Sequence, residues 1–508
     1  MKLKSYKTIG TLLLLVALLI PSIFSLLQPG FFESDDGEWM IIRFSSFYQS
    51  FSDGQFPVRF LGRLNHGFGY PVSNFLYPGF MYLAAPLKLM GLSFVSSIKL
   101  VLIISMIGGG FFTFKWLSKI FDEKSSLIGA IFYTYTPYHL YDLYKRGSVG
   151  EVFALLWIPL VLWAIEERNK LVLGIGVFLL GISHNSLFLL FLPVLFLYSL
   201  IRKKISLKDS IISFALGILM SSFFWIPAIA ELSYTNFSKT QISNISEYFA
   251  SFDLIGISSL AIAFISCLVV VLRKQNFNKE IYMFIALMLG SIILSHGLSE
   301  QVWRILPSSV IQFPFRVLAY TILASAFLAA FILNFSKQKN IVAFLLIVLI
   351  FLSSLGFLSA KVKFNKPDSF YSTNEATTTV RDEYMPYWVK EKPIERFSEK
   401  VELSGRDQTR NQTYNSKKIY FEVSSEKEQV ARVNTIYYPG WIAKVNGREI
   451  EIDYGNRRGV IDLKLPSGAN RVELKFTETP LRLFSDLISL LSFLILLLWA
   501  RKDLRLRK

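Results

Sequence analysis

Residues 8–27 read TIGTLLLLVALLIPSIFSLL, a stretch without a single charged side chain. A helix of this length is about 30 Å long, which matches the hydrocarbon core of a bilayer. The stretch is too long for a signal peptide and lacks its small-residue cleavage site, so we interpret it as a retained anchor. Similar apolar stretches recur at 96–117, 125–142, 151–167, 208–231, 252–272, 279–296, 316–335, 341–360 and 482–499. The sequence therefore predicts a polytopic α-helical membrane protein.

The overall composition supports this class. Of 508 residues, 52% are hydrophobic and 18% are charged, against about 25% charged in ordinary soluble domains. The net charge is +17, but the basic residues form no stripe that could follow a phosphate backbone, so we expect no nucleic-acid partner. The single cysteine, Cys267, excludes an internal disulfide, and the four histidines lack the close spacing of a zinc enzyme.

Two apolar regions leave the topology open. Residues 74–90 are interrupted by prolines, and residues 170–201 are too long for one span and are broken at His184. If 74–90 does not cross and 170–201 forms two short spans, the chain has about 12 spans and basic loops gather on one side. Because basic loops are cytoplasmic, we prefer this arrangement in a plasma membrane, with both termini cytoplasmic. The inner loops are then Met1–Lys7, Lys115–Lys124, Glu166–Lys170, Arg202–Lys208, Arg273–Lys279, Ser336–Asn340 and Arg501–Lys508.

Residues 361–479 differ in kind from the rest of the chain. They contain 21 basic and 18 acidic residues, and their apolar residues alternate with polar ones. This alternation predicts strands at 418–423, 430–437 and 472–476, and Asn446-Gly447 is typical of a hairpin turn. We therefore expect a membrane module (1–360), a small external all-β domain (361–479) and a final transmembrane helix with a basic tail (480–508).

The first external loop begins FFESDDGE at residues 31–38 and is rich in carboxylates. From Trp39 to Phe51 the apolar residues share one helical face, which predicts interfacial helical structure with Arg43 on its polar face. Asp35 could simply cap this helix, with Glu38 completing a capping box. The other interpretation is that several carboxylates at one membrane surface form a functional site.

Three further external segments carry candidate residues. DGQFPVRF at 53–60 and GFGYP at 67–71 are rich in turn formers and aromatic residues. They form either a simple connector or a loop that lies on lipid headgroups and whose glycines let the backbone approach a ligand. In PYHLYDLYKRGSVGE at 137–151, Arg146 and Glu151 lie at the outer ends of adjacent spans. They form either a structural ion pair or one wall of a site facing Asp35 and Asp36, because an unpaired charge there would be costly.

Two isolated residues complete the external set. His184 interrupts two apolar helices within SHN, and is either an interhelical hydrogen-bond partner or a catalytic group. Arg316 ends QFPFR at an outer helix start, where it either extends to the interface or binds a phosphate, whose geometry a guanidinium matches.

The order of these segments along the chain resembles that of a known group of membrane proteins. The segments are the acidic residues after the first span, DGQFPVRF, GFGYP, YTYTPYHLYDLYKRGSVGE, SHN and QFPFR. The group consists of the bacterial and archaeal proteins labelled "6-pyruvoyl-tetrahydropterin synthase-related", which are similar to the YfhO group and belong to the GT-C superfamily of membrane glycosyltransferases. YYPGW (437–441), VNGRE (445–449) and LPSGANRVELKF (465–476) resemble the external domain of YfhO-like proteins. The pterin label implies no chemistry here, since that enzyme needs a three-histidine zinc site.

The resemblance implies a GT-C-like fold and a catalytic carboxylate in the first external loop, which acts on the acceptor. Its spacing to Arg43 points to Asp36, with Asp35 as the competitor, and Glu151 matches a second acidic position. Some GT-C enzymes use a divalent cation, so Mg²⁺ or Mn²⁺ held by Asp35, Asp36 and Glu151 stays open.

The expected function is transfer of a sugar from a polyprenyl-phosphate donor to a glycan or lipid acceptor of the cell envelope, at the external face and among membrane lipids. Asp36 would accept the acceptor's proton, and Arg146 or Arg316 would stabilise the departing phosphate. The alternatives are a transporter or flippase of lipid-linked sugars and a non-catalytic envelope-assembly protein. The expected substrate-binding residues are Glu38, Arg43, Arg59, Tyr70, Arg146, His184 and Arg316.

Overall fold

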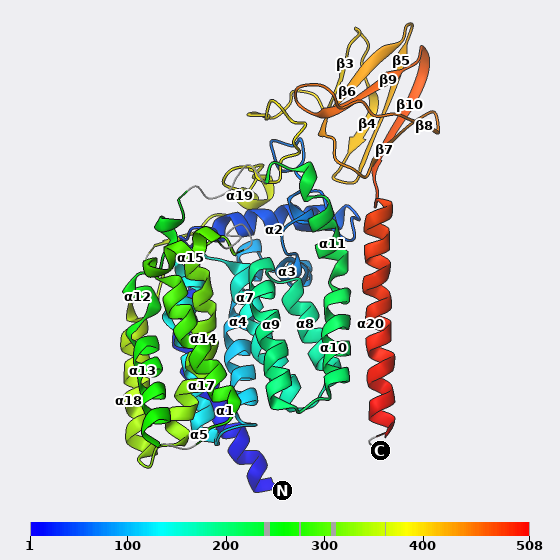
Figure 1. Ribbon diagram of the computed structural model, residues 1–508. Helices are drawn as coiled ribbons and strands as arrows, with labels where there is room; N and C mark the ends of the chain where they lie inside the picture. The colour runs from blue at the N-terminus through cyan, green and yellow to red at the C-terminus, as the bar shows by residue number, and fades with distance from the viewer. Residues whose placement is uncertain (1, 238–243, 274–275, 306–310, 361, 507–508) are drawn as a thin grey trace.

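A computed structural model describes residues 2–237, 244–273, 276–305, 311–360 and 362–506. Most of the chain forms a bundle of helices, and a β domain stands at one end of it (Figure 1). The last helix, α20 (Pro480–Leu506), runs from the β domain back along the bundle. Both chain ends therefore lie at the end of the bundle opposite the β domain, as the charge pattern predicts.

Seven helices in the described ranges are long and apolar enough to cross a membrane, and the number is up to nine if two bent pairs each form one span. The bent pairs are α10 with α11, at 64°, and α14 with the segment Gly297–Ile305, at 84°. The helices of the bundle are α1 (Lys2–Leu27), α4 (Phe94–Leu117), α5 (Glu123–Tyr135), α7 (Val149–Glu166), α8 (Lys170–Gly181), α9 (Asn185–Arg202), α10 (Leu207–Met220), α11 (Ser222–Ala230), α13 (Ile257–Arg273), α14 (Lys279–Ser295), α17 (Ala319–Asn334) and α18 (Lys339–Ser354). The multi-pass class is confirmed, and the count of about 12 spans stays a prediction.

The two ambiguous regions are interrupted as the sequence predicts, whereas a membrane span formed by each half of 170–201 stays a prediction. In the first, α3 (Gly79–Leu89) has 11 residues and is about 16 Å long, too short to cross a core of about 30 Å. In the second, α8 and α9 are separate helices, and His184 Nδ1 accepts a hydrogen bond from the Leu187 N–H at 3.3 Å, which caps α9.

The expected span 125–142 is interrupted. α5 ends at Tyr135, and the chain continues through the short helix α6 (Pro137–Tyr141) into a π-helical turn, η2 (Asp142–Arg146). Thr136, the residue before Pro137, has ψ 130° and so leaves the helical conformation, which residues before proline disfavour. This break places η2 beside the start of α7.

The interfacial helix is α2 (Gly37–Ser52), which lies across the top of the bundle (Figure 1). Its apolar face is buried, but Arg43 and most of its polar face are buried as well. They are covered by the segment that follows α19 (Asp368–Thr373) and by α19 itself, whose Tyr371 carbonyl accepts a hydrogen bond from Ser45 Oγ at 2.6 Å. The predicted helix is thus present, its position at the membrane surface stays a prediction, and a polar face open to water is wrong.

The β domain contains two antiparallel sheets, with strand orders β4-β5-β10-β7-β8 and β3-β6-β9. Asn446 and Gly447 have φ values of 51° and 80° and form the predicted turn between β7 and β8. The strands are β3 (Val401–Leu403), β4 (Arg410–Tyr414), β5 (Lys418–Ser425), β6 (Gln429–Ile436), β7 (Trp441–Val445), β8 (Arg448–Ile450), β9 (Val460–Leu465) and β10 (Gly468–Phe476).

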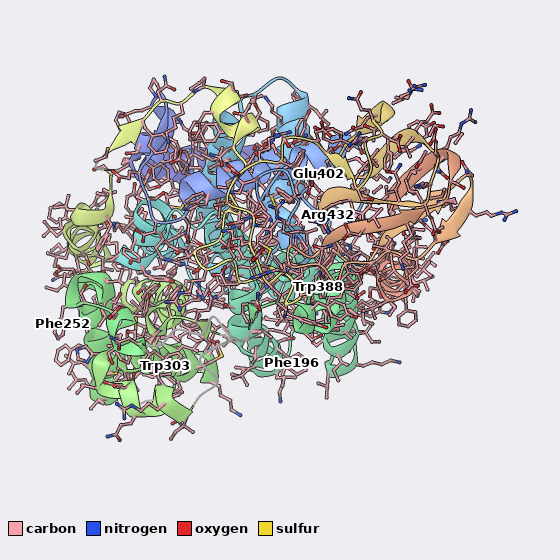
Figure 2. The ribbon with its side chains drawn as sticks, turned by 90° about the horizontal axis from the view of Figure 1, so that it is seen from above. Phe196, Phe252, Trp303, Trp388, Glu402 and Arg432 are labelled. Atoms are coloured by element: carbon pink, nitrogen blue, oxygen red, sulfur yellow. The ribbon has the colours of Figure 1, made fainter. Side chains whose placement is uncertain are left out.

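The first part of the predicted domain, residues 363–399, contributes no strand to these two sheets. Strand β2 (Lys363–Phe364) pairs with β1 (Phe31–Phe32), directly after the first helix. Viewed from above, Glu402 and Arg432 mark the β domain at one side, whereas Phe252 and Phe196 lie at the rim of the helical part (Figure 2). We call residues 363–399 the cover segment, because it joins the two parts over α2.

Candidate active site

Asp36 occupies the N-cap position of α2, but its side chain accepts no hydrogen bond from the first turn of that helix. Ser34 Oγ instead accepts the Gly37 N–H at 3.2 Å, and Glu38 pairs with Lys366 Nζ at 2.5 Å. A capping box of Asp35 and Glu38 is therefore wrong. The Asp36 carboxylate is left for another role.

The acidic loop is attached to the turn before α7 by its backbone. The N–H groups of Asp35 and Asp36 donate to the carbonyls of Lys145 and Arg146, at 3.0 and 2.8 Å. The next residue, Gly147, has φ 63°, and a Cβ there would lie 2.8 Å from the Gly37 nitrogen. A glycine is thus required for this close approach of the two segments.

Glu151, in the first turn of α7, is the centre of a buried ion network. Its Oε1 lies 2.5 Å from Arg146 Nη1 and 2.8 Å from Arg316 Nη2, and its Oε2 accepts from Tyr138 OH at 3.2 Å. Arg146 Nη1 also lies 2.7 Å from Asp142 Oδ1. Buried charges need such partners, so the structural ion pair between Arg146 and Glu151 is present.

Asp36 reaches this network from the solvent side. Its Oδ2 lies 3.9 Å from Arg146 Nη2, and its side chain is 37% exposed, whereas those of Glu151 and Asp142 are 0% exposed. Burial raises the pKa of Asp36, and the charges of Arg146 and Arg43 oppose that rise. Of the three carboxylates, Asp36 is thus the one that a solvent-borne substrate could meet, and a raised pKa suits proton acceptance.

His184 and Arg316 border the same network. His184 Nε2 lies 3.6 Å from Glu151 Oε1, its ring centre is 4.6 Å from that of Tyr77, and burial lowers its pKa to about 3. A neutral imidazole here serves as an interhelical partner. Arg316 is buried rather than extended to the interface, and its Nη1 donates to the Ile311 carbonyl at 2.5 Å.

The remaining residues of the first external loop lie around this network. Asp35 points outward to Lys145, with 3.5 Å between Oδ1 and Nζ and both side chains more than half exposed. Arg43 is buried in α2, where its Nη2 donates to the Thr378 carbonyl at 2.6 Å. Arg43 thus connects the site to the cover segment.

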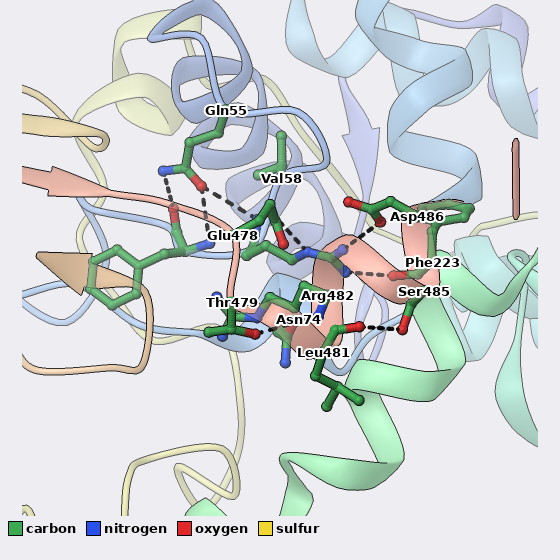
Figure 3. A network of polar contacts seen from close by, with 12 residues as sticks. Gln55, Val58, Asn74, Phe223, Glu478, Thr479, Leu481, Arg482, Ser485 and Asp486 are labelled. Atoms are coloured by element: carbon green, nitrogen blue, oxygen red, sulfur yellow. Dashed lines mark hydrogen bonds and ion pairs between the residues drawn. The ribbon is translucent and has the colours of Figure 1, made fainter. Parts of the chain in front are cut away.

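Arg59 and Tyr70 do not join this group, and their expected contact with substrate stays a prediction. Arg59 lies 3.3 Å from Glu478 and 3.0 Å from Asp486 and donates to the Phe223 carbonyl, so it holds the start of α20. Figure 3 shows these three partners, Glu478, Asp486 and Phe223, around the start of that helix. Tyr70 OH lies 2.9 Å from Thr379 Oγ1 beneath the cover segment. Their buried surroundings indicate structural roles.

Sequence reasoning overlooked Tyr77 and Tyr138 as members of the site. Tyr138 lies within the segment 137–151, where its spacing of 13 residues from Glu151 gives no periodic signal. Tyr77 contacts the site through Gly150, at which a Cβ would lie 2.0 Å from the Tyr77 ring. The only sequence signal that could have assigned both tyrosines to the site is a polar side chain near a helix end.

Asp35, Asp36 and Glu151 do not fit a divalent cation in this arrangement. Glu151 is bound by two guanidinium groups, and Asp35 faces Lys145. Within the described ranges no group of three or more His, Cys, Asp or Glu residues is placed to hold a metal ion. No catalytic step is assigned to a metal at these residues, and the sequence leaves dependence on Mg²⁺ or Mn²⁺ open.

A second ion network lies at the other end of α7. Glu166 accepts from Arg202 Nε at 2.6 Å and from Tyr198 OH at 2.6 Å, and Arg202 Nη1 also lies 2.5 Å from Glu280. All three ionic side chains are at most 14% exposed. Charges on α7 therefore gather at its two ends rather than at its middle.

The C-terminal part of the chain matches a known family. Residues 389–488 match the model of the family described as "Bacterial membrane protein YfhO". The YfhO-like motifs between 437 and 476 fall inside these residues, so the resemblance seen in the sequence is confirmed there. No curated protein matches the chain.

Several solved structures are similar to the chain at low identity. Arabinofuranosyltransferase AftD from Mycobacteria has 15% identity and a TM-score of 0.49, over 70% of this chain and 27% of AftD. The apo oligosaccharyltransferase of Archaeoglobus fulgidus has 10% identity and a TM-score of 0.44, over 76% of this chain and 62% of that one. AglB from the same organism, with an inhibitory peptide and a dolichol-phosphate, has 11% identity and a TM-score of 0.40, over 73% and 56%. The chain thus spans about a quarter of AftD and under two thirds of the archaeal enzymes.

Proposed function

We propose that the chain is a GT-C-type membrane glycosyltransferase that moves a sugar from a polyprenyl-phosphate donor to a hydroxyl group of a cell-envelope acceptor. One observation carries the proposal. Asp36 is a partly exposed carboxylate that caps no helix and lies beside the guanidinium of Arg146. A proton acceptor and a phosphate-binding cation are the two groups that such a transfer needs.

In the proposed reaction, Asp36 accepts the proton of the acceptor hydroxyl as its oxygen bonds to the anomeric carbon of the donor sugar. The bond from that carbon to the phosphate oxygen breaks, and the lipid phosphate leaves with the electron pair. Arg146 and Arg316 lie where they could stabilise the charge that develops on the phosphate. Both are buried, so their attraction for a phosphate is less screened than at a water-exposed site.

Glu151 takes a different role from the one its sequence position suggests. It is fully buried and contacts both guanidinium groups. We therefore propose that Glu151 positions Arg146 and Arg316, while Asp36 performs the proton transfer. The spacing argument left Asp35 and Asp36 as competitors, and the exposed pair of Asp35 with Lys145 favours Asp36.

The site lies at the end of the bundle that bears the β domain (Figure 1). We propose that this end is external and that both termini are cytoplasmic, in agreement with the basic inner loops. AftD and the A. fulgidus proteins are named as glycosyltransferases, and one of them was solved with dolichol-phosphate. We propose a partner of the same kind, a lipid-linked sugar, for this chain.

Proteoliposomes containing the purified chain test the proposal. Polyprenyl-phosphate sugars with radiolabelled head groups are supplied on one face together with extracts of envelope glycans and lipids. Appearance of label in an acceptor supports the transferase, and repeating the assay with EDTA decides the need for a divalent cation. Movement of the labelled lipid across the bilayer without sugar transfer would support the flippase instead. Absence of both sugar transfer and lipid movement would contradict the transferase and the flippase alike.

A further inference from the structure

Five aromatic side chains meet where the β domain, the cover segment and the end of α11 come together. We call Tyr234, Tyr387, Trp388, Tyr437 and Tyr454 the aromatic platform. The rings of Tyr437 and Tyr454 are stacked, with centres 4.1 Å apart and planes at 12°. Trp388 lies 5.5 Å from Tyr454, 5.1 Å from Tyr387 and 6.1 Å from Tyr234. The rings therefore form one continuous group.

Three rings of the platform are open to solvent, whereas Trp388 and Tyr437 are half-buried against the core. Tyr387 is 49% exposed, Tyr234 is 37% exposed and Tyr454 is 36% exposed. Within the described part of the chain, the hydroxyl groups of the four tyrosines make no hydrogen bond. The exposed rings thus combine apolar surface with unused hydroxyl groups at their edges, and an exposed aromatic cluster of this kind commonly marks a binding site.

Backbone and indole hydrogen bonds hold the platform in place. Trp388 Nε1 donates to the Tyr437 carbonyl at 3.1 Å, and the Tyr387 N–H donates to the Tyr234 carbonyl at 2.9 Å. The N–H groups of Lys390 and Glu391 both donate to the Arg457 carbonyl at 2.9 Å. A surface fixed in this way loses little conformational freedom when a ligand binds.

The platform is connected to the proposed site through the cover segment. Arg43, near Asp36, binds the Thr378 carbonyl, and Trp388 follows ten residues later. An extended chain of that length spans at most about 35 Å. An elongated acceptor could therefore contact the platform while its reactive end lies at Asp36.

We propose that the aromatic platform binds sugar units of a glycan acceptor, with their C–H faces stacked on the rings and their hydroxyl groups bonded to the tyrosine hydroxyls. This inference deepens the proposed transferase function and names a place for its acceptor. Sugar rings carry apolar C–H faces and polar edges, the same combination that the platform offers.

Membrane lipid is the other ligand that aromatic residues at a helix end can meet. One observation favours the glycan. Viewed from above, Trp388 lies toward the middle of the molecule, away from the rim where Phe196 and Phe252 lie (Figure 2).

The test measures binding of short neutral oligosaccharides (mannan, glucan, arabinan and chitin fragments) to the full chain in nanodiscs by calorimetry. We expect at least one to bind, and Trp388→Ala and Tyr454→Ala to weaken its affinity by about tenfold. Tyr414→Ala, which removes a 47%-exposed ring of the same domain outside the platform, is the matched control and should leave the affinity unchanged. Should Trp388→Ala fail to fold, Tyr454→Ala and Tyr387→Ala, on exposed rings, carry the test.

Binding by none of the oligosaccharides, or equal binding by the platform variants, overturns the proposal. So does stronger fluorescence quenching by brominated lipids in the wild type than in Trp388→Phe, because this would place the indole in the bilayer. Asp36→Asn should bind the oligosaccharide normally. Loss of transfer and loss of glycan binding are therefore separate results, and either proposal can fail without the other.

Discussion

The two ends of α7 carry two ion networks that resemble each other in composition but differ in access. At the β-domain end Glu151 contacts Arg146 and Arg316, and at the opposite end Glu166 contacts Arg202. Both carboxylates are almost completely buried. The end near the β domain differs because Asp36, a carboxylate with a 37% exposed side chain, lies 3.9 Å from the guanidinium group of Arg146.

The comparison shows that a buried ion network in a membrane bundle is not by itself a functional site. Such networks satisfy charges that the surroundings would otherwise penalise. When one solvent-accessible carboxylate lies beside such a network, a substrate can contact both a proton acceptor and a cation.

The largest effect is expected from Glu151→Gln. Removing this carboxylate leaves two buried guanidinium groups without their shared partner, so the free energy of unfolding should fall by about 3–5 kcal/mol. Transfer should fall as well, even in the molecules that remain folded, because Arg146 and Arg316 lose their fixed positions. Chemical unfolding in mixed micelles and a transfer assay corrected for folded protein measure both effects.

Glu166→Gln is the matched variant at the other end of α7, and its effect should be next in size. It should cost about 3 kcal/mol of stability, because Arg202 keeps its contact with Glu280. The rate of transfer per folded molecule should stay as in the wild type. If Glu166→Gln abolished transfer without unfolding the chain, the distinction between the two ends would be wrong.

The pH dependence of transfer gives a third prediction. Asp36 must be deprotonated to accept a proton, and burial raises its pKa above the ordinary value of 3.8. The rate should therefore fall with decreasing pH, and the fall should begin at a higher pH than an ordinary aspartate would give. Measurement of kcat/KM against pH shows this acid limb. If kcat/KM did not fall as the pH is lowered toward 3.8, Asp36 would be excluded as the base.

The smallest effect is expected from Asp35→Asn. Its pair with Lys145 is exposed, and such pairs contribute about 0–1 kcal/mol, so transfer should change by about twofold or less. The acid limb should move to lower pH, because the charge of Asp35 contributes to the raised pKa of Asp36. A large loss of transfer in this variant would instead assign the base to Asp35.

Much of the fold could be predicted because its signals are local. Uncharged runs of helical length indicate the spans, and alternation indicates strands such as β5 and β10. The division of 170–201 at His184 follows from its length and from the polar interruption. The pairing of Arg146 with Glu151 could also be predicted from the sequence, since both residues lie in one short segment at adjacent helix ends.

The rest depends on contacts between distant segments, which leave no periodic trace in the sequence. Arg316 meets Glu151 across 165 positions, and Arg59 meets Asp486 across 427 positions. The polar face of α2 suggests exposure to water, but the cover segment, which is far away in the chain, buries it. The ion pairs of Arg59 could not be predicted for the same reason, because its partners are in α20 and just before it.

The central claim is tested most directly by the single-turnover rate of Asp36→Asn with a saturating polyprenyl-phosphate sugar and an acceptor that the wild type uses. Amide for carboxylate preserves the shape of the side chain and removes the base, so the rate should fall by about 10²–10⁴-fold while the melting temperature stays near that of the wild type. A rate equal to that of the wild type would contradict the assignment of Asp36 as the base.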